Sequence, residues 1–235
     1  MKSLIRWHAV LFLVLTVMTA GCATFPGQSD SVIGTLRASG PNVWLNGAAG
    51  RDGMAVRLGD TLATGPGSSA MVDFQGGGFL QLDENTDPLF SWIEQTKCIL
   101  TRIMRGQAYL KKEKACVEGP NINLVLNSEA NIRIGAELTE LTLIRGSATV
   151  WRPERVRVET AQQVTVAGQR ISAVRAVSTE ALAAITAWRE TYSFKPPAKR
   201  SGELLRSLRD STSLTNQLPP TDEIKNPTPN QRPLQ

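Results

Sequence analysis

The feature that most constrains the fold is a succession of short segments, between Val32 and Val177, in which apolar and polar residues alternate. Ile132-Arg133-Ile134, Val156-Arg157-Val158 and Val164-Thr165-Val166 have this two-residue period, which is typical of strands with one buried and one solvated face. Glycines, which accept the backbone angles of tight turns, separate many of the segments. The pattern predicts an all-β domain over residues 32–177, built as a β-roll, a solenoid-like stack or a sandwich-like stack of short strands.

Two weak internal similarities favour a repeated hairpin. At an offset of 40 residues, the segment 103–108 parallels the segment 143–148. At an offset of 52 residues, four apolar positions of the segment 72–82 align with four of the segment 124–134: Val72, Phe74, Leu80 and Leu82 with Leu124, Leu126, Ile132 and Ile134. Similar hairpins piled on one another would give a roll or solenoid. Chance alternation of apolar residues is the alternative explanation of the second similarity.

The period changes after Val177. Apolar residues then recur at helical spacing, and Ser178-Thr179-Glu180 suits the start of a helix; the stripe comprises Ala181, Leu182, Ile185, Trp188 and Tyr192. We expect one amphipathic helix over 178–194, packed on one end of the β domain, although a membrane-facing or partner-facing helix has the same pattern. The segment 195–235 is polar and rich in proline, which predicts a mostly disordered tail that serves as a linker or a partner-binding segment.

The N-terminus predicts export. Lys2 and Arg6 precede an apolar run from Ala9 to Ala20, the usual layout of a signal peptide. The run ends in Thr19-Ala20-Gly21-Cys22, which resembles the lipobox of bacterial lipoproteins, with Thr19 where the family usually has Leu. The alternative is an ordinary secretory peptide whose Cys22 ends in a disulfide.

The lipobox resemblance implies a signal peptide over 1–21, a diacylglycerol on Cys22 and a tether over 22–31. Ala23 follows the cysteine, which resembles the default sorting of such lipoproteins to the outer membrane. The expected location is therefore the cell envelope, with the protein held by its lipid at the periplasmic face of the outer membrane.

Composition excludes several functions. Removing residues 1–21 takes Lys2 and Arg6 from a formal charge of +5, and the remaining charge of about +3 gives no reason to expect a nucleic-acid partner. The single histidine, His8, lies in the signal segment. Without it the mature chain has no Ser-His-Asp or Cys-His nucleophile, no His-ligated zinc and no histidine general base. We expect no cofactor, no metal site and no enzymatic activity.

Two cysteines remain beside Cys22. Cys98 and Cys116 are an isolated pair in a chain expected in an oxidising compartment, where such a pair is read as a disulfide. Two reduced cysteines in the core are the alternative. Two thiols without histidine make a poor metal site.

The segment from Val56 to Thr86 resembles a known family. Its run Val-Arg-Leu-Gly-Asp-Thr-Leu-Ala-Thr-Gly, then Ser-Ser-Ala-Met-Val-Asp-Phe, a Gly-rich turn and Phe-Leu-Gln-Leu, is similar to the FecR-type periplasmic domain, whose pattern begins L-x-x-G-D-x-L-x-T-G. The segments 143–150 and 166–169 resemble the closing half of that domain, so the likeness covers about residues 32–175. Residues 88–120 look like an insertion or a divergent hairpin.

Within this motif the residues are turn formers. Gly59-Asp60 predicts a turn in which the Asp side chain bonds to nearby backbone, and Thr64-Gly65 predicts a second turn. A metal-binding or catalytic Asp60 is the alternative, as is a Ca²⁺ site made by Asp83, Glu84 and Asp87. The segment 111–114, Lys-Lys-Glu-Lys, predicts a solvated hairpin tip.

Two functions of different classes follow. Sigma-regulator relatives carry a FecR-type domain behind a cytoplasmic segment and a transmembrane helix, whereas a chain that starts with a lipobox is expected to bind a partner protein or an envelope polymer as a non-catalytic scaffold. Exposed strand edges and three tryptophans, Trp44, Trp92 and Trp151, are candidate contact surfaces, unless the tryptophans are core or rim residues. The alternative is an envelope glycan hydrolase with two carboxylates drawn from Asp60, Asp73, Asp83 and Glu84.

Overall fold

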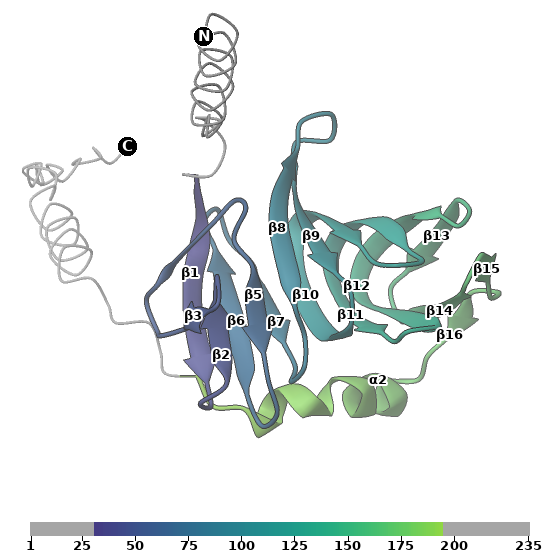
Figure 1. Ribbon diagram of the computed structural model, residues 1–235. Coiled ribbons are helices and arrows are strands. Elements are labelled where there is room, and N and C mark those ends of the chain that lie inside the picture. Colours follow the sequence, from purple (N-terminus) through teal and green to yellow (C-terminus); the bar gives the residue numbers. More distant parts are fainter. Residues whose placement is uncertain (1–30, 195–235) are drawn as a thin grey trace, which may run out of the picture. The chain divides into compact units, whose positions relative to one another are not determined.

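The structure is a computed structural model that describes residues 31–194 (Figure 1). The predicted signal peptide, Cys22, the tether up to residue 30 and the C-terminal tail lie outside the described residues. Their predictions are therefore kept as expectations.

Sixteen strands and one α-helix form between residues 31 and 194. The strands are β1 (Val32–Ser39), β2 (Val43–Leu45), β3 (Ala48–Ala49), β4 (Ala55–Arg57), β5 (Leu62–Thr64), β6 (Ser69–Phe74), β7 (Phe79–Leu82), β8 (Pro88–Ile93), β9 (Cys98–Ile103), β10 (Gly106–Glu118), β11 (Asn123–Ile134), β12 (Leu138–Arg152), β13 (Val156–Glu159), β14 (Gln162–Ala167), β15 (Arg170–Ile171) and β16 (Arg175–Ala176).

Thirteen of these strands belong to one sheet. Its main path is β15-β14-β12-β11-β10-β7-β6-β1-β4, with β13, β16, β8 and β9 branching from it. Neighbours pair antiparallel except β9 and β10, which run parallel. A second sheet contains β3, β2 and β5. The predicted all-β fold with one helix after the strands is confirmed.

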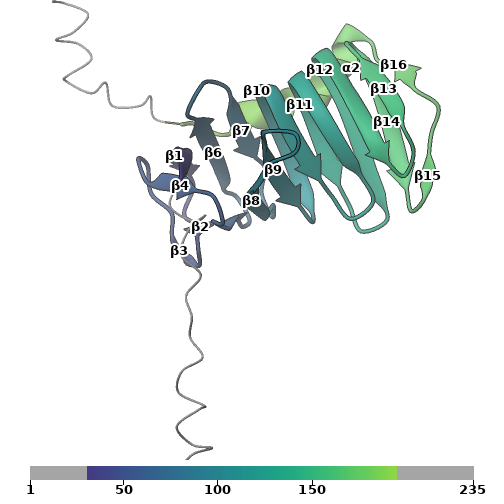
Figure 2. The ribbon, with the colours of Figure 1, turned by 90° about the horizontal axis from the view of Figure 1, so that it is seen from above.

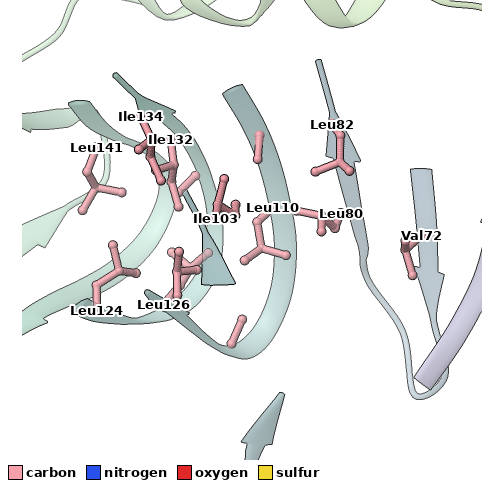
Figure 3. Close-up of a cluster of buried hydrophobic side chains, with 14 of the residues drawn as sticks. Val72, Leu80, Leu82, Ile103, Leu110, Leu124, Leu126, Ile132, Ile134 and Leu141 are labelled. Atoms are coloured by element: carbon pink, nitrogen blue, oxygen red, sulfur yellow. The ribbon is translucent and has the colours of Figure 1, made fainter. Parts of the chain in front are cut away.

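The core lies on one face of the large sheet. Alternate residues of the strands supply it, as the two-residue period predicts, and Figure 3 shows side chains of β7, β9, β10, β11 and β12 gathered there. Leu80, Leu110, Leu126 and Leu141 are all at most 1% exposed. Burial of a leucine side chain contributes about 2 kcal/mol, so this face supplies most of the hydrophobic stabilisation.

The three longest strands are β10, β11 and β12. The register of their pairing shifts at bulges, but the strands continue on both sides of each bulge. The register shifts between Lys112 and Ala115 in β10, so the segment 111–114 lies inside a strand and the predicted hairpin tip there is wrong. The tip is the turn over residues 94–97, between β8 and β9. Charged residues in mid-strand mimic a turn when a bulge leaves them exposed.

A second bulge, at Ile144 of β12, lies close to a glycine with a special backbone conformation. Gly146 lies in β12 with a φ of +82°, and a Cβ there would lie 2.2 Å from the carbonyl oxygen of Asn127. Only glycine accepts both conditions. The resemblance of 143–148 to 103–108 extends to the positive φ of Gly146 and Gly106 but not to the surrounding structure, because the first segment crosses a bulge inside β12 and the second is a turn between β9 and β10.

The second internal similarity does not mark a repeat either. Val72 and Leu80 lie on β6 and β7, the two arms of a hairpin closed by Gly76–Gly78. Leu124 and Ile132 lie on the single strand β11. The same apolar alternation serves a hairpin in one place and one long strand in the other.

The helix is α2 (Thr179–Thr186), and it continues into a 3-10 turn, η1 (Ala187–Thr191). Ser178 is the N-cap, and its Oγ accepts a hydrogen bond of 3.2 Å from the backbone N–H of Ala181. Figures 1 and 2 show α2 running crosswise to the strands. Among residues 31–194, no helix has the length and hydropathy needed to span a bilayer.

Candidate functional site

A row of polar side chains crosses the large sheet on the face away from the core. Each member is paired directly with the next across six strands, in the order Gln81, Tyr109, Asn131, Thr142, Gln163 and Arg175. The first five are between 1% and 6% exposed. Buried polar groups must find hydrogen-bond partners or cost free energy. We call these six residues the polar row.

The helical segment covers the first half of the polar row with polar contacts. Arg189 Nε donates to Gln81 Oε1 at 3.1 Å, and Trp188 Nε1 donates to Asn131 Oδ1 at 3.1 Å. Gln107 Nε2 donates to the carbonyl oxygen of Ile185 at 3.4 Å. The helical segment, predicted to pack through an apolar stripe, therefore also makes hydrogen bonds to the sheet, and none of its residues is fully buried.

Arg189 also stacks on aromatic rings. Its guanidinium carbon lies 3.5 Å from the ring centroid of Tyr109 and 5.5 Å from that of Phe79. Burial raises the pKa of Tyr109 above its ordinary value, and the hydrogen bond that its phenol donates to Glu129 adds to the shift. Arg189 therefore covers the Tyr109 ring through a cation–π contact.

Past Asn131 the row opens into a cavity of about 400 Å³ between the sheet and α2. Its polar walls come from β10, β11, β12, β14 and β16, and its roof comes from the helical segment; the lining residues are Gln107, Asn131, Arg133, Glu140, Thr142, Gln163, Arg175, Ala184, Ile185 and Trp188. The volume is in the range of small-ligand pockets. We call it the helix cavity.

Hydrogen bonds hold the floor of the helix cavity in place. Gln163 Nε2 donates to Thr142 Oγ1 at 2.9 Å, and Arg175 Nε donates to Gln163 Oε1 at 2.9 Å. Asn131 Oδ1 accepts from Trp188 and also from Gln107 Nε2 at 3.2 Å. Such a network fixes the side-chain rotamers before any ligand arrives.

Several groups that line the cavity keep spare hydrogen-bonding capacity. Within residues 31–194, Asn131 Nδ2 and Gln107 Oε1 have no protein partner, although Asn131 is only 3% exposed. Arg133 Nη1 lies 3.8 Å from Glu140 Oε2, which is beyond hydrogen-bond distance. A ligand in the cavity would therefore meet a hydrogen-bond donor on Asn131, an acceptor on Gln107 and the guanidinium of Arg133.

The motif turn residues do structural work elsewhere. Asp60 Oδ2 accepts from the Arg57 N–H at 2.7 Å, and its Oδ1 accepts from Asn46 Nδ2 at 2.7 Å. Gly59 has a φ of +88°, which its position before Asp60 requires. These contacts close the turn and join it to the loop after β2.

Thr64 and Gly65 hold a neighbouring loop. Thr64 Oγ1 accepts from the Thr86 N–H at 3.0 Å, and the Gly65 N–H donates to the carbonyl oxygen of Asn42 at 2.8 Å. A Cβ on Gly65 would lie 3.0 Å from the ring of Trp44. None of these residues lines the helix cavity.

Cys98 and Cys116 form a disulfide in the structure, with their Cα atoms 6.0 Å apart. It joins β9 to β10, the one parallel pair, and so fastens the β8–β9 hairpin to the sheet.

The acidic residues considered for catalysis contact different partners. Asp60 contacts Asn46, Asp73 pairs with Arg37 at 2.6 Å, and Asp83 accepts from the Tyr192 hydroxyl at 2.8 Å. Glu84 Oε2 accepts from the Gly67 N–H at 2.7 Å. In the described part of the chain, no group of three or more His, Cys, Asp or Glu side chains is placed to hold a metal ion.

The three tryptophans are partly exposed, at 37% for Trp44, 39% for Trp92 and 52% for Trp151. Trp92 lines a hollow of about 450 Å³ beside Ser31 and Leu58. Trp151 lines a groove of about 330 Å³ beside Leu100 and Cys116, and Arg155 stacks on its ring at 4.6 Å. Trp92 and Trp151 belong to different hollows, so they do not make one stacking platform.

The polar row was missed at the sequence level. Its signal is a polar residue between two buried apolar ones, as in Leu80-Gln81-Leu82 and Leu141-Thr142-Leu143. That pattern also describes any solvated strand face. Only the strand register shows that these polar residues lie side by side beneath a helix.

Comparison with known proteins gives a likeness to two crystal structures, each described as that of a putative anti-sigma factor from Parabacteroides distasonis ATCC 8503. They are 13% and 14% identical to this chain, with TM-scores of 0.44 and 0.45. The matches cover 65% of this chain and 92% and 91% of those chains. No protein-family profile matches the sequence, and no curated protein does.

The contact of Tyr192 with Asp83 gives a pH prediction. Burial and the Asp83 carboxylate raise the pKa of Tyr192 to about 12, so the folded state favours the neutral phenol. The stabilisation is present below pH 10, the ordinary tyrosine value, and is lost as the pH rises from 10 to 12. In urea unfolding, we expect Tyr192→Phe to cost about 1 kcal/mol at pH 9 and much less at pH 12. An equal cost at both pH values would contradict this.

Proposed function

We propose that this protein is a non-catalytic, lipid-anchored binding protein of the cell envelope, built on a FecR-like β domain. The helix cavity is its binding site. The single observation that carries the proposal is a cavity whose polar walls are held by hydrogen bonds and yet keep Asn131 and Gln107 groups without partners. Preformed cavities with a few convergent polar groups are the usual form of ligand sites.

The motif residues support the FecR-like assignment. The segment that resembles that domain forms β4 to β7, and its glycines and Asp60 close the turns between these strands. These residues make structural contacts, and none of them lines the helix cavity.

The surface near Ser31 supports the anchor. Ser31 is the first described residue, and it lies beside a hollow lined by Leu58, Trp92 and Ile99. Tryptophan favours the boundary between hydrocarbon and water. A domain tethered through residue 30 would therefore present an apolar, tryptophan-bearing surface close to the bilayer.

The anchor has a direct test. We expect Cys22→Ser to abolish acylation and to release the protein from the membrane fraction into the soluble periplasm, because no lipid then holds it. Fractionation and intact-mass measurement read out both effects. Release must leave the fold unchanged, which circular dichroism checks. A Cys22→Ser protein that stays membrane-bound would contradict the anchor.

The binding site is tested by photo-crosslinking in intact envelopes. A photoreactive residue at Ala184, which lines the helix cavity, should capture a specific envelope component; the same residue at the adjacent exposed Ala183, outside the lining, should not. Equal capture from both positions, or from neither, would contradict the site. Hydrolysis of isolated envelope polymer by the purified protein would instead favour a glycan-acting enzyme.

A further inference from the structure

The chemistry of the helix cavity narrows the class of its ligand. Resting on the proposed binding role, we propose that the cavity takes a small molecule or terminal group that carries a carboxylate with a neighbouring hydroxyl or amide. Arg133 and Arg175 hold the carboxylate, and the free amide groups of Asn131 and Gln107 hold its neighbour. The argument rests on charge, hydrogen-bonding capacity and size.

Charge favours an anion. Two arginines, Arg133 and Arg175, and one acid, Glu140, line the cavity, so the lining carries a formal charge of +1. Arg133 and Glu140 form an ion pair with their closest nitrogen and oxygen 3.8 Å apart, so the positive charge that no acid of the lining pairs is that of Arg175. An arginine guanidinium prefers a carboxylate because it can donate two parallel hydrogen bonds.

The position of Arg175 is fixed without using up its donors. Gln163 Oε1 accepts from Arg175 Nε at 2.9 Å and also from its Nη2. Within residues 31–194, Nη1 has no protein acceptor. Gln163 is itself held by Thr142, so the guanidinium is oriented before a ligand binds. The side chain of Arg133 is 69% exposed.

Asn131 and Gln107 form a second, uncharged contact point in the helix cavity. Asn131 Nδ2 can donate, and Gln107 Oε1 can accept. The two side chains are joined by the 3.2 Å hydrogen bond from Gln107 Nε2 to Asn131 Oδ1, so these free groups are neighbours. A hydroxyl or an amide of the ligand satisfies one donor and one acceptor at once. A bare hydrocarbon would leave both groups unpaired, at a cost of about 1–3 kcal/mol each.

Size limits the ligand. A cavity of about 400 Å³ lies near the small end of ligand pockets. It suits one sugar acid or the end of a short peptide. Both sources supply a carboxylate beside a hydroxyl or amide, so the experiment distinguishes them.

The test uses the mature chain with Cys22→Ser and follows binding by calorimetry or NMR at low salt. Glucuronate is compared with glucose, in which a hydroxymethyl group replaces the carboxylate, and N-acetyl-alanyl-alanine is compared with its C-terminal amide. We expect at least one acid to bind about tenfold or more tightly than its neutral partner, since a hydrogen bond to a charged group contributes about 1.5–3 kcal/mol. The acid that binds identifies the source.

Variants locate the binding. Arg133→Gln and Arg175→Gln should each weaken binding of the preferred acid about tenfold. Arg157→Gln is the matched control, because that arginine is 70% exposed on β13 and lies outside the cavity lining. Asn131→Asp should also weaken the acid by placing a second negative charge in the cavity. Circular dichroism confirms that each variant is folded.

Two results would overturn the inference. One is equal binding of acid and neutral partner, or no binding of either acid. The other is an equal loss in Arg157→Gln. If Ala184 still captures an envelope component in these cases, the proposed binding role stands and only the carboxylate assignment falls.

Discussion

Replacing Cys98 and Cys116 together with alanine is expected to lower the free energy of unfolding by about 3 kcal/mol. The disulfide closes a loop with a sequence separation of 18, and the entropy that it removes from the unfolded chain corresponds to about that value. The hairpin β8–β9 contacts the large sheet through β9, so the loss should extend beyond the loop itself. Urea unfolding of the Cys22→Ser chain gives the measurement.

Reduction provides the matched comparison. Treating the Cys22→Ser chain with a thiol reductant should lower its stability by a similar amount, and the double alanine variant should not respond to reductant. If the double variant unfolds within 0.5 kcal/mol of the parent, the bridge does not stabilise the domain as argued.

The second large effect is expected from Leu110→Ala in β10. Leu110 is 1% exposed on the core face, where Figure 3 shows it among the other buried side chains. Truncating a buried leucine costs about 2–5 kcal/mol, because the contacts are lost and a cavity remains. Chemical unfolding should show this loss.

The neighbour of Leu110 is the control. Lys111 is exposed and points to the other face of the same strand, so Lys111→Ala should change the free energy of unfolding by no more than about 0.5 kcal/mol. A large cost for Lys111→Ala, or a small one for Leu110→Ala, would mean that the two faces of β10 are assigned the wrong way round.

The alternation of apolar residues predicted the strands because each strand buries one face locally. Ile132 and Ile134 are buried, and Arg133 between them is exposed, as their spacing indicates. Ser178 likewise predicted the helix start, since capping depends on residues three apart. Strand alternation and helix capping both depend on residues close together in the chain, so both can be predicted from the sequence.

Strand length and the site could not be predicted in this way. Whether residues 111–114 turn or continue depends on pairing with β7 and β11, which lie outside the segment itself. The polar row joins Gln81 to Arg175 through register across six strands, and the helix cavity exists only because α2 returns over that row. No local pattern carries this information.

The most direct measurement of the central claim is retention of the Cys22→Ser chain on a column of immobilised, lipid-free envelope extract when the helix cavity is filled. Ala184 is exposed on α2 and lines the cavity, so Ala184→Trp should plug it while leaving the sheet intact. Ala183→Trp adds the same side chain one residue away, outside the lining. We expect Ala184→Trp to lose most of the retention of the Cys22→Ser chain, and Ala183→Trp to keep it. Equal retention of the two variants would contradict the helix cavity as the binding site.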